Sequence, residues 1–271
     1  MGCSLDRGTD SGFPDETPVR PVTIDGHRSG GVFVVQVDAP PPADGRRRWL
    51  ALTGTPLSPT IWTAVADRLD GPLWAPDVTP PTDVTDPQRR VAERIAARAR
   101  EGGGTWSVVG HSFGGQVALE LALAAPELVQ HLVIIGSRDT PFPPFAAAAD
   151  ALTAGHPVDV DGALARWFRP AELDRFPGVV ADITGQLRRA DRAAWATALR
   201  GIARFDAADR IGAITAPVAV IAAEFDPVSP PEVMTAMARR IPGATVDVWP
   251  DAAHLSPLLH PDRLAGLLLG G

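Results

Sequence analysis

The sequence predicts an α/β fold in which helices cover both faces of a mostly parallel sheet of eight strands. Three observations carry this prediction. Short apolar runs of strand length alternate with helical patterns along most of the chain, an order typical of a parallel sheet. A glycine-rich turn, Gly110 to Gly115, joins one such run directly to a helical pattern. The 271 residues, 45% hydrophobic and 21% charged, are enough for one sizeable core.

The expected strands are short apolar runs: Val22–Ile24, Val32–Val37, Arg48–Leu52, Leu73–Ala75, Trp106–Val109, Leu132–Ile135, Val218–Ala222 and Thr245–Trp249. We expect an antiparallel hairpin at the start of the sheet and parallel strands after it. Helical patterns lie between most of the later strands: Thr60–Leu69, Pro87–Arg100, Phe113–Ala124, Pro231–Arg240 and Pro261–Leu268. In such sheets the active site lies beyond the carboxyl ends of the strands.

Residues 139–210 contain no convincing strand. Ala-rich and Arg-rich helical patterns fill them, with breaks at residues such as Pro170 and Gly201. We therefore expect a helical lid, inserted after the sixth strand, that excludes water from the site and shapes its pocket. The core then comprises residues 21–138 and 211–271. Residues 1–20 are polar and rich in Gly, Asp and Pro, and are expected to be disordered.

Ser112 is the candidate nucleophile. It is the central residue of Gly110-His111-Ser112-Phe113-Gly114, a G-x-S-x-G sequence between a predicted strand and a predicted helix. A serine in this strained turn holds its hydroxyl clear of the sheet, and the flanking glycines leave room for the crossing backbones. The same glycine pattern also occurs in ordinary turns and phosphate loops. His111 is expected to be structural.

A serine hydroxyl needs a base, and the base needs a carboxylate to hold its tautomer. Asp226 follows the predicted strand Val218–Ala222, and His254 lies in the loop after the next strand. These two are the candidate acid and base. Glu224 competes with Asp226 but lies nearer the strand. Asp139, just after the strand Leu132–Ile135, is the more serious alternative.

With these residues in place, the chain from about Val22 to Leu269 resembles an α/β-hydrolase. Asp226 to Pro230 matches the D-x-x-x-P turn of that family, and His254 follows one strand later. The resemblance implies two backbone N–H groups that bind the oxyanion of the transition state, those of Phe113 and Thr55. Pro56 has no N–H and cannot donate.

Two loops depart from the family's pattern. Thr53 stands where relatives usually have a histidine, so the loop that carries Thr55 is also open to interpretation as a proline-stiffened surface loop. The loop from Asp77 to Asp83 is rich in proline instead of glycine. Since this loop borders the site in the family, the substrate or the reaction can differ from those of a common esterase.

Five aromatic residues are candidates for the substrate pocket: Trp62, Trp167, Phe168, Phe176 and Trp195. The alternative is that they only attach short helices to the body. Three arginines of the same region, Arg166, Arg169 and Arg175, either meet a substrate carboxylate or form a solvated face.

Composition excludes several kinds of chemistry. All 25 basic residues are arginine, and Lys, Asn and Tyr are absent, as expected from a bacterial genome of high G+C content. A Schiff-base lysine, a Ser-Lys dyad and a tyrosine acid are therefore impossible within this chain. The net charge of −7 and the spread of arginine along the chain argue against nucleic acid as a partner. The basic cluster Arg46 to Arg48 is expected at a solvated hairpin edge.

We expect a cytoplasmic protein with no membrane partner, because no apolar run approaches the length of a membrane span and no signal segment is recognisable. Cys3 is the only cysteine, so no internal disulfide is possible, and an exposed, inert thiol is expected. His254 and His260 have no carboxylate or cysteine at metal-ligand spacing. No metal and no cofactor are predicted.

The predicted function is that of a serine hydrolase that cleaves an ester, lactone or thioester of small to medium size through an acyl-enzyme. Its partner would be a small acyl substrate. One alternative is a cyclase, acyl transferase or lyase that uses the same serine and histidine, because a fold hosts many functions. The other is a catalytically idle binding protein.

Overall fold

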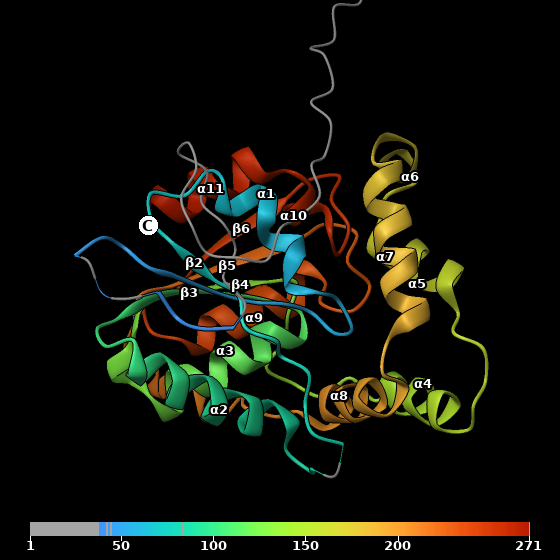
Figure 1. The fold of residues 1–271 in the computed structure, drawn as a ribbon, viewed down its shortest axis with the longest axis horizontal. Coiled ribbons are helices and arrows are strands. Elements are labelled where there is room, and N and C mark those ends of the chain that lie inside the picture. Colours follow the sequence, from blue (N-terminus) through green and yellow to red (C-terminus); the bar gives the residue numbers. More distant parts are fainter. Residues whose placement is uncertain (1–37, 42, 44, 83, 271) are drawn as a thin grey trace, which may run out of the picture.

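In the computed structural model, the described residues are 38–41, 43, 45–82 and 84–270. Six parallel strands in these ranges form one sheet in the order β2-β1-β3-β4-β5-β6 (Figure 1). They are β1 Trp49–Leu52, β2 Leu73–Trp74, β3 Trp106–His111, β4 Val129–Ile135, β5 Val218–Ala223 and β6 Thr245–Trp249. The parallel α/β fold is thus confirmed. The two expected strands before residue 38, residues 1–20 and Cys3 lie outside the described residues.

Side chains alternate between the two faces of the sheet, as the strand period of two requires. Leu50 and Leu52 of β1 join one buried cluster, whereas Trp49 and Ala51 join the other. Helices complete each cluster (Figure 1). The first face is covered by α2 Pro87–Glu101, α3 Phe113–Ala124 and α9 Pro231–Arg240, and the second by α1 Thr63–Ala66, α10 Ser256–Leu259 and α11 Pro261–Gly270.

The order of the strands fixes where a site can form. The chain passes from β1 to β2 on one side of β1 and then returns to β3 on its other side. At such a switch point the loops after neighbouring strands turn apart and leave a crevice at the carboxyl edge of the sheet. The loop after β1 carries Thr55, and the turn after β3 carries Ser112. The two predicted oxyanion-binding segments therefore lie at the same edge of the sheet, where Gly54 packs against Ser112.

The helix predicted over Thr60–Leu69 is shorter than expected. The segment begins as a 3₁₀ turn, η1 Pro59–Trp62, continues as α1, and ends in i→i+3 turns at Arg68 and Leu69. β2 begins only four residues after Leu69. Gly71 in this connection approaches the backbone so closely that a Cβ there would lie 1.8 Å from the carbonyl oxygen of Arg47. The short connection leaves no room for another helical turn.

The helical insertion, residues 139–210, lies between β4 and β5. Its helices are α4 Pro144–Thr153, α5 Val160–Trp167, α6 Pro170–Arg175, α7 Pro177–Arg189 and α8 Arg192–Arg204. Prolines begin α4, α6 and α7, where a missing N–H costs nothing. α4 packs on α8, and α8 packs on α2 of the core, while α5, α6 and α7 stand beside the end of the sheet (Figure 1). Whether the insertion acts as a lid stays a prediction.

The prediction that Arg46 to Arg48 all lie at a solvated edge is wrong for Arg48, which is 3% exposed. Its guanidinium lies 4.1 Å from the ring centre of Trp106 and donates to the carbonyl oxygens of Gly102 and Gly103. The physical reason is that the loop before β3 folds back over the start of β1. Its carbonyl oxygens face the guanidinium of Arg48, which can donate to several of them at once.

Candidate active site

Ser112 lies in a sharp turn between β3 and α3. Its backbone has φ 54° and ψ −121°, a conformation that a residue other than glycine adopts only under strain. The N–H of Ser112 donates to the carbonyl of Ile135 at 3.0 Å, and its own carbonyl accepts from Ser137 Oγ at 2.7 Å. The turn is therefore anchored on β4, and Ser112 stays partly exposed among buried neighbours.

The glycines around Ser112 are required by close packing. A Cβ at Gly110 would lie 2.5 Å from the carbonyl oxygen of Gly114, and one at Gly114 would lie 2.2 Å from that of Leu52. Neither distance is possible without displacing backbone. The G-x-S-x-G spacing thus lets α3 begin directly against the ends of β1 and β3.

Asp226 and His254 form a hydrogen bond of 2.6 Å between Oδ2 and Nδ1, and are 1% and 4% exposed. The second carboxylate oxygen, Oδ1, accepts from the backbone N–H groups of Val228 and Ser229 at 2.9 and 3.1 Å. Burial by itself raises the pKa of Asp226, but His254 and these N–H donors outweigh it, so the pKa lies below its usual value. Asp226 is therefore an ionised carboxylate that holds the Nδ1 side of the imidazole.

His111 connects the turn of Ser112 to the loop of His254. Its Nε2 lies 3.0 Å from the carbonyl oxygen of His254, and the two rings are 4.7 Å apart between centres. Because a carbonyl only accepts, Nε2 carries the proton, and the unprotonated Nδ1 has no partner among the described residues. Burial and the neighbouring His254 lower the pKa of His111 to about 3, so it stays neutral. Its expected structural role agrees with these contacts.

Gly136 and Ser137, which the sequence analysis did not single out, lie between the three predicted catalytic residues. Gly136 has φ 50°, and a Cβ there would lie 3.2 Å from both Asp226 Oδ2 and His254 Nδ1. Ser137 holds the carbonyl of Ser112. The available signal was a Gly-Ser pair directly after an apolar strand, at the edge where parallel strands end. The turn of Ser112 and the Asp226–His254 pair thus each contact the residues at the end of β4.

The alternative acids have other partners. Asp139 is fully buried and binds Arg240 at 3.0 Å instead of a histidine. Burial raises the pKa of Asp139, and the charge of Arg240 opposes this. Glu224 accepts from the backbone N–H of Asp251 at 2.8 Å. Neither carboxylate contacts His254, so the geometry favours Asp226.

Thr55 and Phe113 offer free backbone donors near Ser112. Neither N–H donates to another residue in the described part of the chain. Gly54, which precedes Thr55, is packed against the nucleophile turn: a Cβ there would lie 2.9 Å from the Cβ of Ser112. Phe113 is the first residue of α3, where the helix dipole favours a negative charge. Both segments therefore border Ser112, as an oxyanion site requires.

The five aromatic candidates are buried to different extents. Trp62 is completely buried and donates from Nε1 to Thr53 Oγ1 at 3.0 Å, so the threonine that replaces the family's histidine holds this ring. Trp167 and Phe168 are 9% and 2% exposed and pack with the α1, α10 and α11 side of the core. The remaining two, Phe176 and Trp195, are partly exposed and pack against the core clusters.

The arginines of the insertion also have partners in the structure. Arg169 binds Asp251 at 3.1 Å and lies 3.8 Å from the ring centre of Phe225. The carbonyl of Trp167 accepts from the N–H of Leu255. These contacts attach the insertion to the loops that carry Asp226 and His254. The other two, Arg166 and Arg175, lie near Asp159 and the ring of Phe176 respectively and are exposed.

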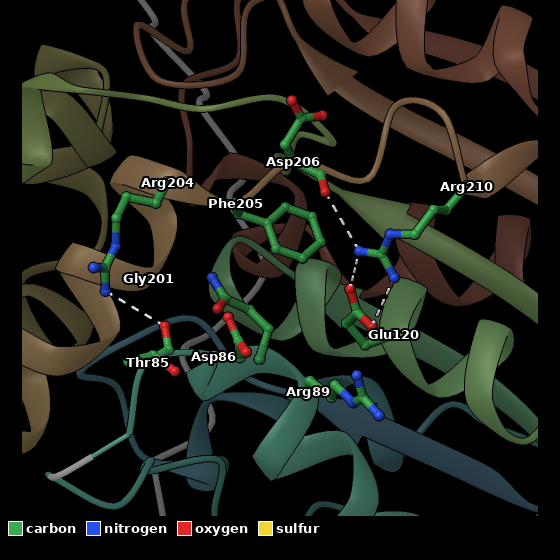
Figure 2. Close-up of a pocket in the computed structure, with 10 residues that line it drawn as sticks. Thr85, Asp86, Arg89, Glu120, Gly201, Arg204, Phe205, Asp206 and Arg210 are labelled. Atoms are coloured by element: carbon green, nitrogen blue, oxygen red, sulfur yellow. Dashed lines mark hydrogen bonds and ion pairs between the residues drawn. The ribbon is translucent and has the colours of Figure 1, made fainter.

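A pocket of about 460 Å³ lies between the start of α2, the helix α3 and the end of α8 (Figure 2). Phe205 and Gly201 at the end of α8 face Glu120 of α3 across it, and Glu120 pairs with Arg210. None of the predicted site residues lines it.

In the described ranges no three His, Cys, Asp or Glu side chains gather as metal ligands would, and the absence of a metal stays a prediction. No helix in the described ranges has the length and apolar character needed to cross a membrane.

Comparisons with known proteins show the family of this chain. Residues 26–267 match the alpha/beta hydrolase family. A pimeloyl-[acyl-carrier protein] methyl ester esterase of Neisseria meningitidis is 29% identical over 223 residues, which cover 78% of this chain and 83% of that protein. Lipase LipV of Mycobacterium tuberculosis is 31% identical over 147 residues, 51% of this chain and 53% of that one.

Solved structures give the same fold. A thermophilic esterase from Thermogutta terrifontis is 25% identical, with a TM-score of 0.70 over 86% of this chain and 90% of that one. An enol-lactonase from Burkholderia xenovorans has a TM-score of 0.72 at 19% identity over 85% and 93% of the two chains, which is a likeness of fold alone.

Proposed function

Because this chain belongs to the alpha/beta hydrolase family, we propose that it is a serine esterase whose nucleophile is Ser112. The observation that carries the proposal is the 2.6 Å hydrogen bond between His254 Nδ1 and Asp226 Oδ2, beside a serine in a strained turn. In a neutral imidazole whose Nδ1 donates to the carboxylate, the other nitrogen is an acceptor. An acceptor nitrogen is what a base for a serine hydroxyl must present.

In the proposed mechanism, Ser112 Oγ attacks the carbonyl carbon while Nε2 of His254 takes the hydroxyl proton. Asp226 stabilises the imidazolium that forms. The N–H groups of Thr55 and Phe113 bind the oxyanion of the tetrahedral intermediate. Collapse of this intermediate breaks the ester bond, and His254 returns the proton to the leaving oxygen. Water, activated by the same histidine, then releases the acid from the acyl-enzyme.

The proposed substrates are carboxylic esters, lactones or thioesters of small to medium size. The names of two relatives, a methyl ester esterase and a thermophilic esterase, support an ester. The helical insertion would act as the lid, since Arg169 and Trp167 attach it to the loops of Asp226 and His254.

The test is covalent labelling followed by turnover. A fluorophosphonate probe should label the wild type and fail to label Ser112→Ala, and mass spectrometry should place the adduct on Ser112. Turnover is then measured on short-chain to medium-chain p-nitrophenyl esters, lactones and acyl thioesters, with product masses to show the addition of water. A folded wild type that the probe does not label would refute the proposal.

A further inference from the structure

Three consecutive residues after β4 each hold a different part of the proposed site. Gly136 lies against the Asp226–His254 pair, and Ser137 binds the carbonyl of Ser112. The third residue, Arg138, reaches the loop that carries Asp226: its Nη1 donates to the carbonyl oxygen of Val228 at 2.8 Å. Gly136 has no side chain, and the hydroxyl of Ser137 is already bound to Ser112, so neither side chain can act on Asp226. The side chain of Arg138 can.

The guanidinium of Arg138 is half-buried and bound only by neutral groups. Besides Val228, it donates to the carbonyl and the hydroxyl of Thr140 at 2.8 and 3.3 Å, and it lies 4.9 Å from the ring centre of Phe142. It forms no ion pair with a carboxylate of the described residues. Burial lowers the pKa of Arg138, whereas the charges of Asp139 and Asp226 raise it, and the cation persists.

The charge of Arg138 acts on two nearby buried carboxylates, Asp139 and Asp226. Asp139 is paired with Arg240 of α9 at 3.0 Å. His111 from β3 is buried and neutral. The carboxylate of Asp226 receives the N–H of Val228, the residue whose carbonyl Arg138 holds. One guanidinium thus fixes the loop that orients the acid and places a positive charge near the Asp226–His254 pair.

We propose that Arg138 is a positioning residue that holds the Asp226 loop and favours an ionised Asp226 beside a neutral His254. This inference rests on the proposed function, because the position and charge of Asp226 affect activity only if His254 accepts a proton from Ser112. A cation near the pair opposes its protonation, so the charge should extend activity to lower pH. Loss of the charge should therefore move the acidic limb of the pH profile to higher pH.

The experiment compares Arg138→Met, Arg138→Gln and Arg138→Lys with the wild type, using a p-nitrophenyl ester from pH 5 to 9 with correction for ionisation of p-nitrophenol. Arg138→Met should lower kcat about 10- to 100-fold with little change in KM, since the acid is misplaced and not the substrate. Its acidic limb should rise by about half a pH unit or more. Arg138→Lys, which keeps the charge, should restore the position of the limb.

Arg48→Met is the matched control, because Arg48 also binds backbone carbonyls, those of Gly102 and Gly103, and lies over an aromatic ring, but at the start of β1. It should keep the wild-type profile. If Arg138→Met does not fold, Arg138→Gln decides, since its amide can still donate but carries no charge. An unchanged acidic limb in a folded, uncharged variant overturns the inference.

The two proposals fail in different ways. A wild type that is not labelled at Ser112 refutes the proposed esterase itself. A labelled wild type whose Arg138 variants keep its pH profile and kcat refutes only the role of Arg138.

Discussion

The replacement of Asp226 by asparagine tests the proposed acid with little change of shape. In the native loop, Oδ1 accepts two backbone N–H groups and Oδ2 accepts from His254 Nδ1. An asparagine that keeps its oxygen toward Val228 and Ser229 turns its NH₂ toward Nδ1. The imidazole must then carry its proton on Nε2, and it cannot accept the proton of Ser112.

The size of the loss follows from these contacts. Rotating the amide to restore the correct tautomer would leave two buried N–H groups facing an NH₂, at about 1–3 kcal/mol each. Together these costs correspond to a decrease of about 30-fold to about 3 × 10⁴-fold in rate. The neutral amide also no longer stabilises the imidazolium, so we expect kcat to fall about 10⁴-fold.

The assay is turnover of a p-nitrophenyl ester, with fluorophosphonate labelling to count competent sites. Asp139→Asn is the matched control, because Asp139 binds Arg240 and not His254. It should keep kcat near the wild-type value even if it lowers stability. The assignment would be refuted by an Asp226→Asn variant that retains more than about a tenth of wild-type kcat, or by a larger loss in Asp139→Asn.

Three further predictions concern other residues. The pKa of His111 is about 3 in the folded protein and near 6.5 in the unfolded chain, so below pH 6.5 the unfolded chain binds a proton that the folded protein does not. The free energy of unfolding should therefore fall on the order of 1 kcal/mol per pH unit from pH 6 to 4. Urea unfolding at several pH values should show a shallower fall for His111→Gln than for the wild type, and equal slopes would contradict this. Gly136→Ala should lower stability by more than about 1 kcal/mol and also lower kcat, because φ is positive and the Cβ would crowd the acid-base pair; a wild-type melting temperature with wild-type kcat would count against it. Arg48→Met should lower the unfolding free energy by about 1.5–3 kcal/mol without changing kcat, since Arg48 lies at the opposite edge of the sheet from Ser112; a large loss of kcat with unchanged stability would exclude this explanation.

The fold and the strand ends that carry the candidate site residues could be predicted because their signals are local. The alternation of strand and helix patterns predicted the parallel sheet, and the positions of Ser112, Asp226 and His254 at strand ends predicted one shared edge. The glycine spacing around Ser112 is also a local signal, because it lies within one short motif, although Gly114 owes its small size to the distant Leu52. Helix ends were less certain, as the shortened segment at Thr60–Leu69 shows, because they depend on where the next strand must begin.

By itself, the sequence determined which residue types could perform chemistry and on which strand ends they stand. It could not decide which partners they meet. Asp139 and Asp226 both follow a strand, and only the tertiary structure pairs one with Arg240 and the other with His254. The sequence likewise predicts Arg48 at the surface, whereas in the structure its guanidinium binds the loop before β3. The physical reason is that pairing depends on sheet order: β4 lies between β3 and β5, so the residues after it contact segments distant in the chain. Periodicity and turn chemistry act over a few residues, whereas this neighbourhood is created only when the whole sheet forms.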